Sequence, residues 1–405
     1  MKVLQINAVG GIRSTGRLSS EIDDYLNANG HEGYQAYSYG KSGSHSYIIG
    51  STLDHKTHAF LSHLFGLQAY FSHFSTMKLL KHIEKIKPDV VHLHNLHNNF
   101  INLKMLTSFL SKNKIPTLYT QHDCWGFTGK CGHFTVTDCY RWKTGCGECP
   151  RLKKDNKSWF FDRTHKMVRD KKKWFGSIPK LAVVGVSDWL TEHASKAPVF
   201  GNAISFRRIY NWVDLEKFKP LITSTEEKER LLGLKDKFII LGVASGWGKD
   251  KGLESFLGLA KLLPEDMKIV LVGRMSSGVI LPHNIVHIRE THNVDEMVEF
   301  YNMADVFVHL SPEETFGMVT AEALACGTPA IVLNCTANPE VVGEGCGYVA
   351  ESDYAEEILT LINEVKSKGK SFFSEKCIAF ARENFNKEDR IKDYINCYEE
   401  LLSSK

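Results

Sequence analysis

The chain has 405 residues, more than one hydrophobic core usually organises, so two domains with a cleft between them are expected. Hydrophobic residues make up 43% and charged residues 24%, which are the averages of soluble globular proteins and exclude a long disordered tract. The net charge is +3, but residues 1–210 hold 29 Lys and Arg against 15 Asp and Glu, or +14, and the remainder hold 21 against 32, or −11. The basic first half favours phosphorylated or membrane-surface partners.

The first ten residues, MKVLQINAVG, lack the long apolar core of a signal peptide, and no stretch approaches the roughly 20 apolar residues of a membrane span. We therefore expect a cytoplasmic protein. In that compartment the ten cysteines are expected to be buried thiols or metal ligands rather than a disulfide framework.

The first half of the chain alternates short apolar runs with helical stretches. Helices are predicted over residues 14–27 and 75–87. Each predicted strand is apolar on consecutive residues, as in a strand buried on both faces of a parallel sheet, and these strands cover residues 2–9, 89–94, 117–121 and 181–186. This alternation predicts a doubly wound α/β domain over residues 1–210.

The alternation restarts after a polar stretch at residues 223–229, a plausible crossing between domains. Strands of a second sheet are predicted over residues 238–243, 269–273, 306–310 and 329–333. This second domain covers residues 211–385. Residues 372–402 are predicted to be helical, and a C-terminal helix over residues 386–405 is expected to pack back toward the first domain. Ligands of such folds bind at the carboxyl ends of the strands, so functional residues should lie on loops that follow strands.

The segment from Ser311 to Pro329 is the most informative part of the chain. It follows a predicted buried strand, and a turn at Phe316 and Gly317 precedes a predicted helix. Glu322 lies eight residues after Glu314, about two helical turns, so both carboxylates can reach one ligand. A helix N-terminus suits phosphates, and carboxylates accept hydrogen bonds from hydroxyl groups. The alternative is that Glu314 favours the helix start and that Glu322 belongs to a solvated face.

This Glu-x7-Glu segment, with Phe-Gly inside it and Ala-Cys-Gly-Thr-Pro after it, resembles family 4 of the glycosyltransferases. Residues 209–220, IYNWVDLEKFKP, are similar to the interdomain segment of that family, and residues 301–309, YNMADVFVH, to its penultimate helix and strand. The resemblance implies the GT-B fold, which consists of two facing Rossmann-like domains. It assigns the donor sugar to Glu314 and the ribose to Glu322.

The resemblance also implies a donor site on both domains. The Gly10–Gly11 loop would approach the donor phosphates, because a residue without Cβ permits a close approach. Lys251 looks like the phosphate-binding lysine of the family. Where the family places an arginine this chain has Gly246, so Lys249 could supply the second cation, or it could lie in solvent. The other residues assigned to the donor site are Gly273, Arg274, Phe316, Gly317, Met318 and Val319.

Histidines end two strands of the first domain. His122 resembles the family histidine near the reacting sugar, although a lone histidine at a strand end is often structural. His92, His94 and His97 invite a metal interpretation, but GT-B enzymes resemble one another in needing no catalytic metal. We therefore favour cleft lining or acceptor contact for these three histidines.

The resemblance implies a retaining transfer without a catalytic cofactor, with a UDP-sugar favoured over a GDP-sugar as donor. The acceptor hydroxyl attacks the anomeric carbon while Lys251, Lys249 and backbone N–H groups stabilise the charge that develops on the leaving phosphate. The implied setting is surface polysaccharide synthesis, with a saccharide or a lipid-diphosphate-linked saccharide as acceptor. We see no carboxylate pair arranged as in glycoside hydrolases.

Four cysteines, Cys131, Cys139, Cys146 and Cys149, lie in an insertion expected at residues 124–150. The two-residue gap in the last pair lets both thiolates bind one tetrahedral ion, which predicts a structural zinc site, although the earlier gaps fit only loosely. Packed reduced thiols and a redox pair are the alternatives. The insertion resembles a cysteine-bearing loop in some family members from surface-polysaccharide pathways.

Residues 151–180 hold eleven Lys and Arg against three acidic residues, interleaved with Trp159, Phe160, Phe161, Trp174 and Phe175. This composition suits peripheral contact with the anionic cytoplasmic face of a membrane, and a solvated helix face is the alternative.

Two other function classes stay open at this point. One is a different enzyme of the same fold, such as a nucleotide-sugar epimerase or a phosphorylase. The other is a nucleic-acid-binding protein that uses the basic stretch and the cysteines, but this leaves the Glu314 segment unexplained. We therefore expect no nucleic-acid partner.

Overall fold

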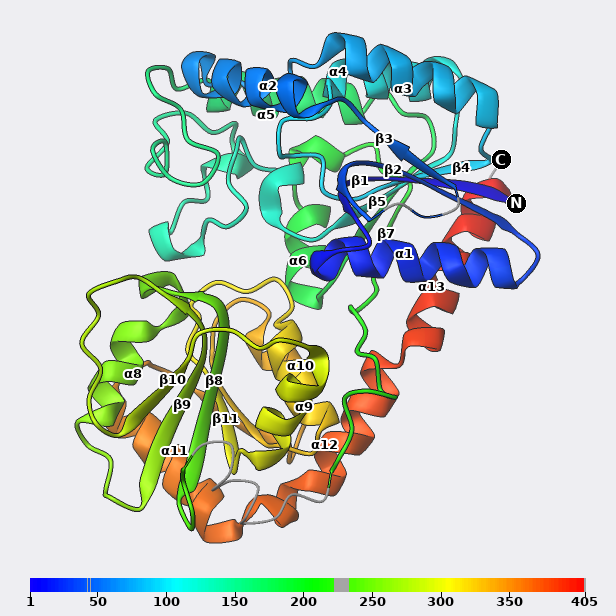
Figure 1. Ribbon diagram of the computed structural model, residues 1–405. Coiled ribbons are helices and arrows are strands. Elements are labelled where there is room, and N and C mark those ends of the chain that lie inside the picture. The colour runs from blue at the N-terminus through cyan, green and yellow to red at the C-terminus, as the bar shows by residue number, and fades with distance from the viewer. Residues whose placement is uncertain (42, 44, 222–232, 404–405) are drawn as a thin grey trace. The chain divides into compact units, whose positions relative to one another are not determined.

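The computed structural model describes residues 1–41, 43, 45–221 and 233–403, and the chain divides into two compact units (Figure 1). Unit 1 consists of Met1–Ile209 together with Ile391–Lys405, and unit 2 of Tyr210–Arg390. The expected crossing at residues 223–229 falls outside the described residues. Within the described part of the chain, no helix combines the length and the apolarity that crossing a membrane requires.

Unit 1 contains a seven-stranded sheet in which every strand runs parallel to its neighbours, in the order β3-β2-β1-β4-β5-β6-β7. Its strands are β1 (Lys2–Gly10), β2 (Glu32–Gly40), β3 (Ser46–Ile48), β4 (Val90–Leu93), β5 (Thr117–Gln121), β6 (Leu181–Gly185) and β7 (Ser205–Arg208). Strands β4, β5 and β6 are buried along their whole length, because helices cover both faces of the sheet (Figure 1).

The helices of unit 1 form two layers. On one side of the sheet lie α2 (Thr52–Phe65), α3 (His73–Ile86), α4 (Leu103–Lys112) and α5 (Thr164–Phe175), at the top of Figure 1. On the other side lie α1 (Arg13–Ala28), α6 (Asp188–Ser195) and α13 (Lys387–Ser403). The hydroxyl of Tyr398 in α13 is 2.8 Å from Nδ1 of the buried His92 in β4, so the end of the chain is tied into the core of this unit.

Unit 2 contains a six-stranded parallel sheet in the order β10-β9-β8-β11-β12-β13. Its strands are β8 (Phe238–Trp247), β9 (Met267–Met275), β10 (Ile285–Ile288), β11 (Val306–His309), β12 (Ala330–Leu333) and β13 (Gly347–Ala350). Its helices are α8 (Leu253–Ala260), α9 (Val294–Met303), α10 (Met318–Ala325), α11 (Ala355–Lys368) and α12 (Lys370–Phe385). The predicted α/β fold with two Rossmann-like parallel-sheet domains is confirmed.

The helical structure predicted for residues 372–402 is confirmed, and it consists of two helices, because α12 ends at Phe385 and α13 begins at Lys387. Asn386 between them has an extended backbone, with φ −64° and ψ 128°. The N–H of Val213 donates to the carbonyl of Phe385 at 3.0 Å, and Val213 forms a β-bridge with Asn386. This pairing of two chain segments interrupts the helix.

In each sheet, two strands that are not consecutive in the chain lie side by side and mark the point where the strand order reverses. In unit 1 these strands are β1 and β4, and in unit 2 they are β8 and β11. Loops that leave the carboxyl ends of such a pair diverge to opposite sides of the sheet, and the crevice between them is where doubly wound folds bind ligands.

Candidate active site

The crevice of unit 2 brings Lys251 and Glu314 together. Lys251 ends the short 3₁₀ helix η5 (Lys249–Lys251), which follows β8, and Glu314 lies on the loop that follows β11. The Nζ atom of Lys251 donates to Oε1 of Glu314 at 2.5 Å and to Oγ of Ser311 at 3.4 Å. Both charged side chains are largely buried, with exposed fractions of 29% and 18%.

His309, the last residue of β11, is the third group at this carboxylate. Its Nε2 lies 3.3 Å from Oε1 of Glu314, close enough for attraction although the contact lacks hydrogen-bond geometry. Burial would raise the pKa of Glu314, but the neighbouring His309 and Lys251 outweigh burial and lower this pKa below its usual range. Glu314 is therefore ionised at neutral pH and can accept hydrogen bonds from hydroxyl groups.

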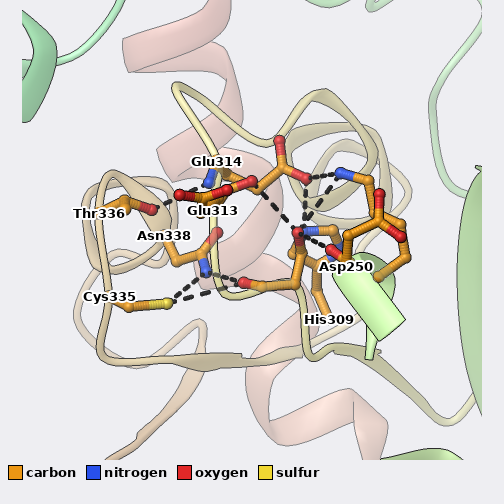
Figure 2. Close-up of polar contacts among 9 residues, drawn as sticks. Asp250, His309, Glu313, Glu314, Cys335, Thr336 and Asn338 are labelled. Atoms are coloured by element: carbon orange, nitrogen blue, oxygen red, sulfur yellow. Dashed lines mark hydrogen bonds and ion pairs between the residues drawn. The ribbon is translucent and has the colours of Figure 1, made fainter. Parts of the chain in front are cut away.

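Hydrogen bonds from the segment that follows β12 fix the backbone around Glu314. Figure 2 shows Thr336, Cys335 and Asn338 on one side of this loop and Asp250 and His309 on the other. The backbone N–H of Glu314 donates to Oγ1 of Thr336 at 3.0 Å, and the amide of Asn338 donates to the carbonyl of Ser311 at 2.9 Å. Sequence reasoning missed Thr336, Asn338 and His309, although their position just after or at the end of a predicted strand could have indicated them.

Glu322 is placed differently from Glu314. It lies on α10, and its Oε2 accepts a hydrogen bond of 3.0 Å from the hydroxyl of the buried Tyr301 on α9. The two carboxylates thus have separate partners, and their contact with one ligand stays a prediction. Gly317, immediately before α10, has a φ of 89°, a left-handed conformation that favours glycine.

The remaining donor-site candidates of unit 2 have varied surroundings. Lys249 is 87% exposed and lies 3.9 Å from Glu254, whereas Arg274 donates to Glu290 at 2.9 Å on the surface. The Phe316 ring is buried between Tyr210 and Phe385, at centroid distances of 5.7 and 5.4 Å. Its side chain therefore belongs to the hydrophobic core. Met318 and Val319 begin α10 and are partly exposed.

The glycine loop of unit 1, Gly10 and Gly11, lies at the end of β1. The packing around Gly10 explains why this position holds a glycine. A Cβ on Gly10 would lie 2.4 Å from the ring of Tyr37, so this position excludes larger residues. Gly11 has a φ of 64° and lines a polar pocket of about 150 Å³ together with Asp24 and Lys41. This pocket is a feature of unit 1 alone.

Three histidines that follow or lie in β4 and β5 interact with one another. His122, one residue after β5, has its Nε2 3.0 Å from Nδ1 of His94, and Nε2 of His94 lies 2.9 Å from Oε1 of Gln5 in β1. Burial lowers the pKa of His122 to about 4 and holds that of His94 well below the usual value, so both are neutral at pH 7. The ring of His92 lies against that of His94, with centroids 4.0 Å apart and an angle of 40° between the ring planes.

His97 instead forms an ion pair with Asp123. Its Nε2 lies 2.8 Å from Oδ2 of Asp123, and Oδ1 accepts from the backbone N–H of Trp125 at 2.8 Å. Burial would lower the pKa of His97, but Asp123 outweighs it and raises this pKa. Asp123 is a residue that sequence reasoning did not single out, although it is adjacent to His122.

All four cysteines of the predicted zinc site line one small pocket in unit 1. The neighbouring Cys131 thiol is the main reason why the pKa of Cys149 lies below the ordinary value of a thiol. Among the residues that the structure describes, no three His, Cys, Asp or Glu side chains are grouped so that they could hold a metal ion. Zinc therefore stays a prediction.

The basic-aromatic stretch divides into a buried and an exposed part. Trp174 and Phe175 in α5 belong to the core, and Lys171 is buried with its ammonium donating to the carbonyls of Trp125 and Thr128 at 2.5 and 3.0 Å. Phe160 and Phe161 are 68% and 45% exposed. Trp174 and Phe175 therefore do not belong to an exposed basic and aromatic surface, because α5 needs an apolar face to pack on the sheet, and membrane contact stays a prediction.

Part of this chain is similar in sequence to known glycosyltransferases. A family model described as Glycosyl transferases group 1 matches residues 224–384. The putative colanic acid biosynthesis glycosyl transferase WcaC of Escherichia coli (strain K12) is 24% identical over 331 residues, covering 78% of this chain and 77% of that protein. The capsular polysaccharide biosynthesis glycosyltransferase CapM of Staphylococcus aureus is 30% identical over 172 residues, covering 38% and 44%.

Among solved structures, HepE from Anabaena in complex with UDP and glucose has a similar fold, with a TM-score of 0.67 at 15% identity over 98% of this chain and 99% of that chain. The match of the family model spans the whole stretch from η5 to α12, and so includes Lys251, Glu314 and Glu322. Residues 224–384 of this chain are therefore similar to the glycosyl transferases group 1 family, and the fold is of the GT-B type.

Proposed function

We propose that this protein transfers a sugar from a nucleoside diphosphate sugar to a hydroxyl group of a saccharide acceptor during the synthesis of a surface polysaccharide. The observation that carries the proposal is the buried Lys251–Glu314 pair in the crevice between β8 and β11, inside the matched family segment. The resemblance to WcaC and CapM supports polysaccharide synthesis. UDP is the favoured nucleotide because HepE binds it.

The chemistry of the pair suits both halves of this reaction. We propose that ionised Glu314 accepts hydrogen bonds from hydroxyl groups of the donor sugar and that the adjacent Lys251 ammonium stabilises the charge that develops on the leaving phosphate. We propose retention of configuration, in which the acceptor hydroxyl attacks from the face that the phosphate leaves and the phosphate takes its proton. Because Lys251 supplies the cation, catalysis is expected to persist in the presence of a metal chelator.

A thermal-shift panel of UDP-, GDP-, ADP- and TDP-sugars tests donor binding. A ligand that binds the native state alone raises the midpoint of unfolding, and the panel is expected to single out a UDP-sugar. Lys251→Met should remove the shift, and Lys261→Met, on the exposed end of α8, should retain it. Acceptor-dependent release of UDP would then separate transfer from epimerisation, which needs no acceptor. No shift with any nucleotide sugar would contradict the proposal.

We also propose that unit 1 contacts an anionic membrane surface, where a lipid-diphosphate-linked acceptor would be found. The support is an exposed aromatic patch made by Phe60 and Phe65 of α2 and residues 159–161, in which the rings of Phe60 and Trp159 lie 5.6 Å apart. The exposed cations Lys153, Lys157 and Arg163 flank this aromatic patch in the chain. Rings that insert and cations that attract are the two ingredients of interfacial binding.

Flotation with vesicles of phosphatidylglycerol and phosphatidylcholine tests this contact. A double variant, Phe160→Ser with Phe161→Ser, should lose binding at low salt, whereas Phe372→Ser, an equally exposed phenylalanine of unit 2, should not. Equal binding by the two variants, or none by the wild type, would contradict the membrane proposal.

The zinc site is a separate proposal, supported by four thiols around one pocket. Because the side chains are not grouped as a ligand set, zinc binding would require them to draw together. Elemental analysis of protein purified without added metal is expected to find about one equivalent of zinc, and less than one-tenth would argue against the site.

A further inference from the structure

A chain of hydrogen bonds crosses the core of unit 1 from a backbone carbonyl to His122. The side-chain Nε2 of Gln5 lies 2.7 Å from the carbonyl oxygen of Ser19, and it also donates to Asp23. The Oε1 atom of Gln5 then contacts His94, which contacts His122. Each contact after Ser19 could in principle be made with donor and acceptor exchanged.

The backbone carbonyl of Ser19 fixes which atom of the Gln5 amide donates and which accepts. A carbonyl oxygen only accepts hydrogen bonds, so the amide of Gln5 must turn its NH₂ group toward Ser19. Its Oε1 atom therefore points to His94 and has to accept there. This sets the orientation of a side chain whose oxygen and nitrogen are otherwise interchangeable.

The orientation of Gln5 in turn fixes the tautomers of His94 and His122. A neutral imidazole carries one N–H, and burial keeps both rings neutral at pH 7. His94 must donate to Gln5 from Nε2, so its Nδ1 holds a lone pair and accepts from His122. His122 consequently carries its proton on Nε2 and its lone pair on Nδ1. The opposite tautomer of His94 would place two lone pairs opposite each other at Gln5.

We propose that Gln5 and His94 are positioning residues that hold His122 in the Nε2–H tautomer, so that its Nδ1 can act only as a hydrogen-bond acceptor. The chemical class that fits is a hydroxyl group, as on a sugar. The contact with a sugar hydroxyl rests on the proposed function, whereas the tautomer of His122 does not. His122 then orients a hydroxyl and does not supply a proton.

Nitrogen-15 NMR of histidine-labelled protein without substrate tests the tautomer directly. For His122 and His94 we expect a protonated Nε2 and an unprotonated Nδ1, with each signal set assigned by its loss in His122→Asn or His94→Asn. A protonated Nδ1 on His122 in the wild type would overturn the inference. If the wild-type protein gives the expected spectrum but transfers no sugar, the result counts against the proposed function and not against the tautomer.

Two substitutions of Gln5 sharpen the test. Gln5→Met removes both hydrogen bonds, so the signals of His94 and His122 should move toward those of mixed tautomers, and kcat is expected to fall about tenfold. In Gln5→Glu, burial beside Asp23 favours the protonated acid, which can donate to Ser19 and accept from His94. The wild-type spectrum should therefore be retained. Unchanged tautomers in a folded Gln5→Met variant would contradict the positioning role.

Discussion

At the scale of single residues, the two glutamates of the family segment have different environments. Glu314 is held between Lys251 and His309, whereas Glu322 accepts a hydrogen bond from a buried tyrosine. In the proposed transfer Lys251 stabilises the leaving group, so the neighbouring carboxylate of Glu314 would affect the transition state. A carboxylate that binds a hydroxyl remote from the reacting carbon, as proposed for Glu322, stabilises the ground state and the transition state equally.

Glu314→Gln is therefore expected to lower kcat about 100-fold or more, whereas Glu322→Gln should mainly raise KM for the donor. Steady-state kinetics with the preferred nucleotide sugar measure this difference. Both variants keep the size of the side chain, and circular dichroism should show an unchanged fold. Equal effects on kcat would contradict the separate roles.

At the scale of elements, the central strands could be predicted from the sequence and the outer strands could not. β4, β5 and β6 are buried along their whole length, as central strands of a parallel sheet are. β2, β3, β7, β10 and β13 were missed because they are partly exposed and mix polar with apolar residues. The Lys251 and Glu314 loops could be located because they follow recognisable strands. The Gln5–His94–His122 chain could not, because it joins three strands whose pairing the sequence does not reveal.

Gly273 lies where β9 passes closest to β8. Its φ is 131°, and a Cβ there would lie 1.7 Å from the carbonyl oxygen of Ala244. Gly273→Ala should destabilise unit 2 by on the order of 3 kcal/mol, measured by urea unfolding, because both backbone strain and a clash result. Gly246→Ala on β8, with a nearest contact at 3.9 Å, is the matched control and should change stability little.

Lys171 connects helix α5 to the segment that leads into the cysteines. Removing its ammonium in Lys171→Met leaves the carbonyls of Trp125 and Thr128 without this donor, and a loss of about 2 kcal/mol or more is expected. Differential scanning calorimetry measures the change. Lys172→Met, an exposed neighbour on the same helix, should have a midpoint close to that of the wild type. Equal midpoints for the two variants would show that the buried contact does not stabilise the fold.

At the scale of the whole molecule, unit 1 carries an unusual number of buried neutral histidines. Burial lowers the pKa of His58 to about 3 and that of His122 to about 4, and the pKa values of His92 and His94 are also well below the ordinary value. Histidine in the unfolded chain has a pKa of about 6.5. Below this pH the unfolded chain therefore binds more protons than the folded chain.

The free energy of unfolding is thus expected to be at its full value above about pH 6.5 and to fall as the pH drops toward 4. Urea midpoints at several pH values measure this decrease. His58→Gln should reduce the slope of stability against pH by up to about 1.4 kcal/mol per pH unit. A wild-type midpoint that does not change between pH 7 and pH 4.5 would contradict the account of these histidines.

The central claim is that the Lys251–Glu314 pair of unit 2 carries out sugar transfer. The most direct measurement follows a radiolabelled sugar from its UDP donor into a lipid-extractable or polysaccharide fraction, with wild type, Lys251→Met and Lys261→Met compared at equal protein concentration. We predict labelled product with wild type and Lys261→Met, and a loss of at least about 100-fold with Lys251→Met. Full incorporation by a folded Lys251→Met variant would contradict the claim.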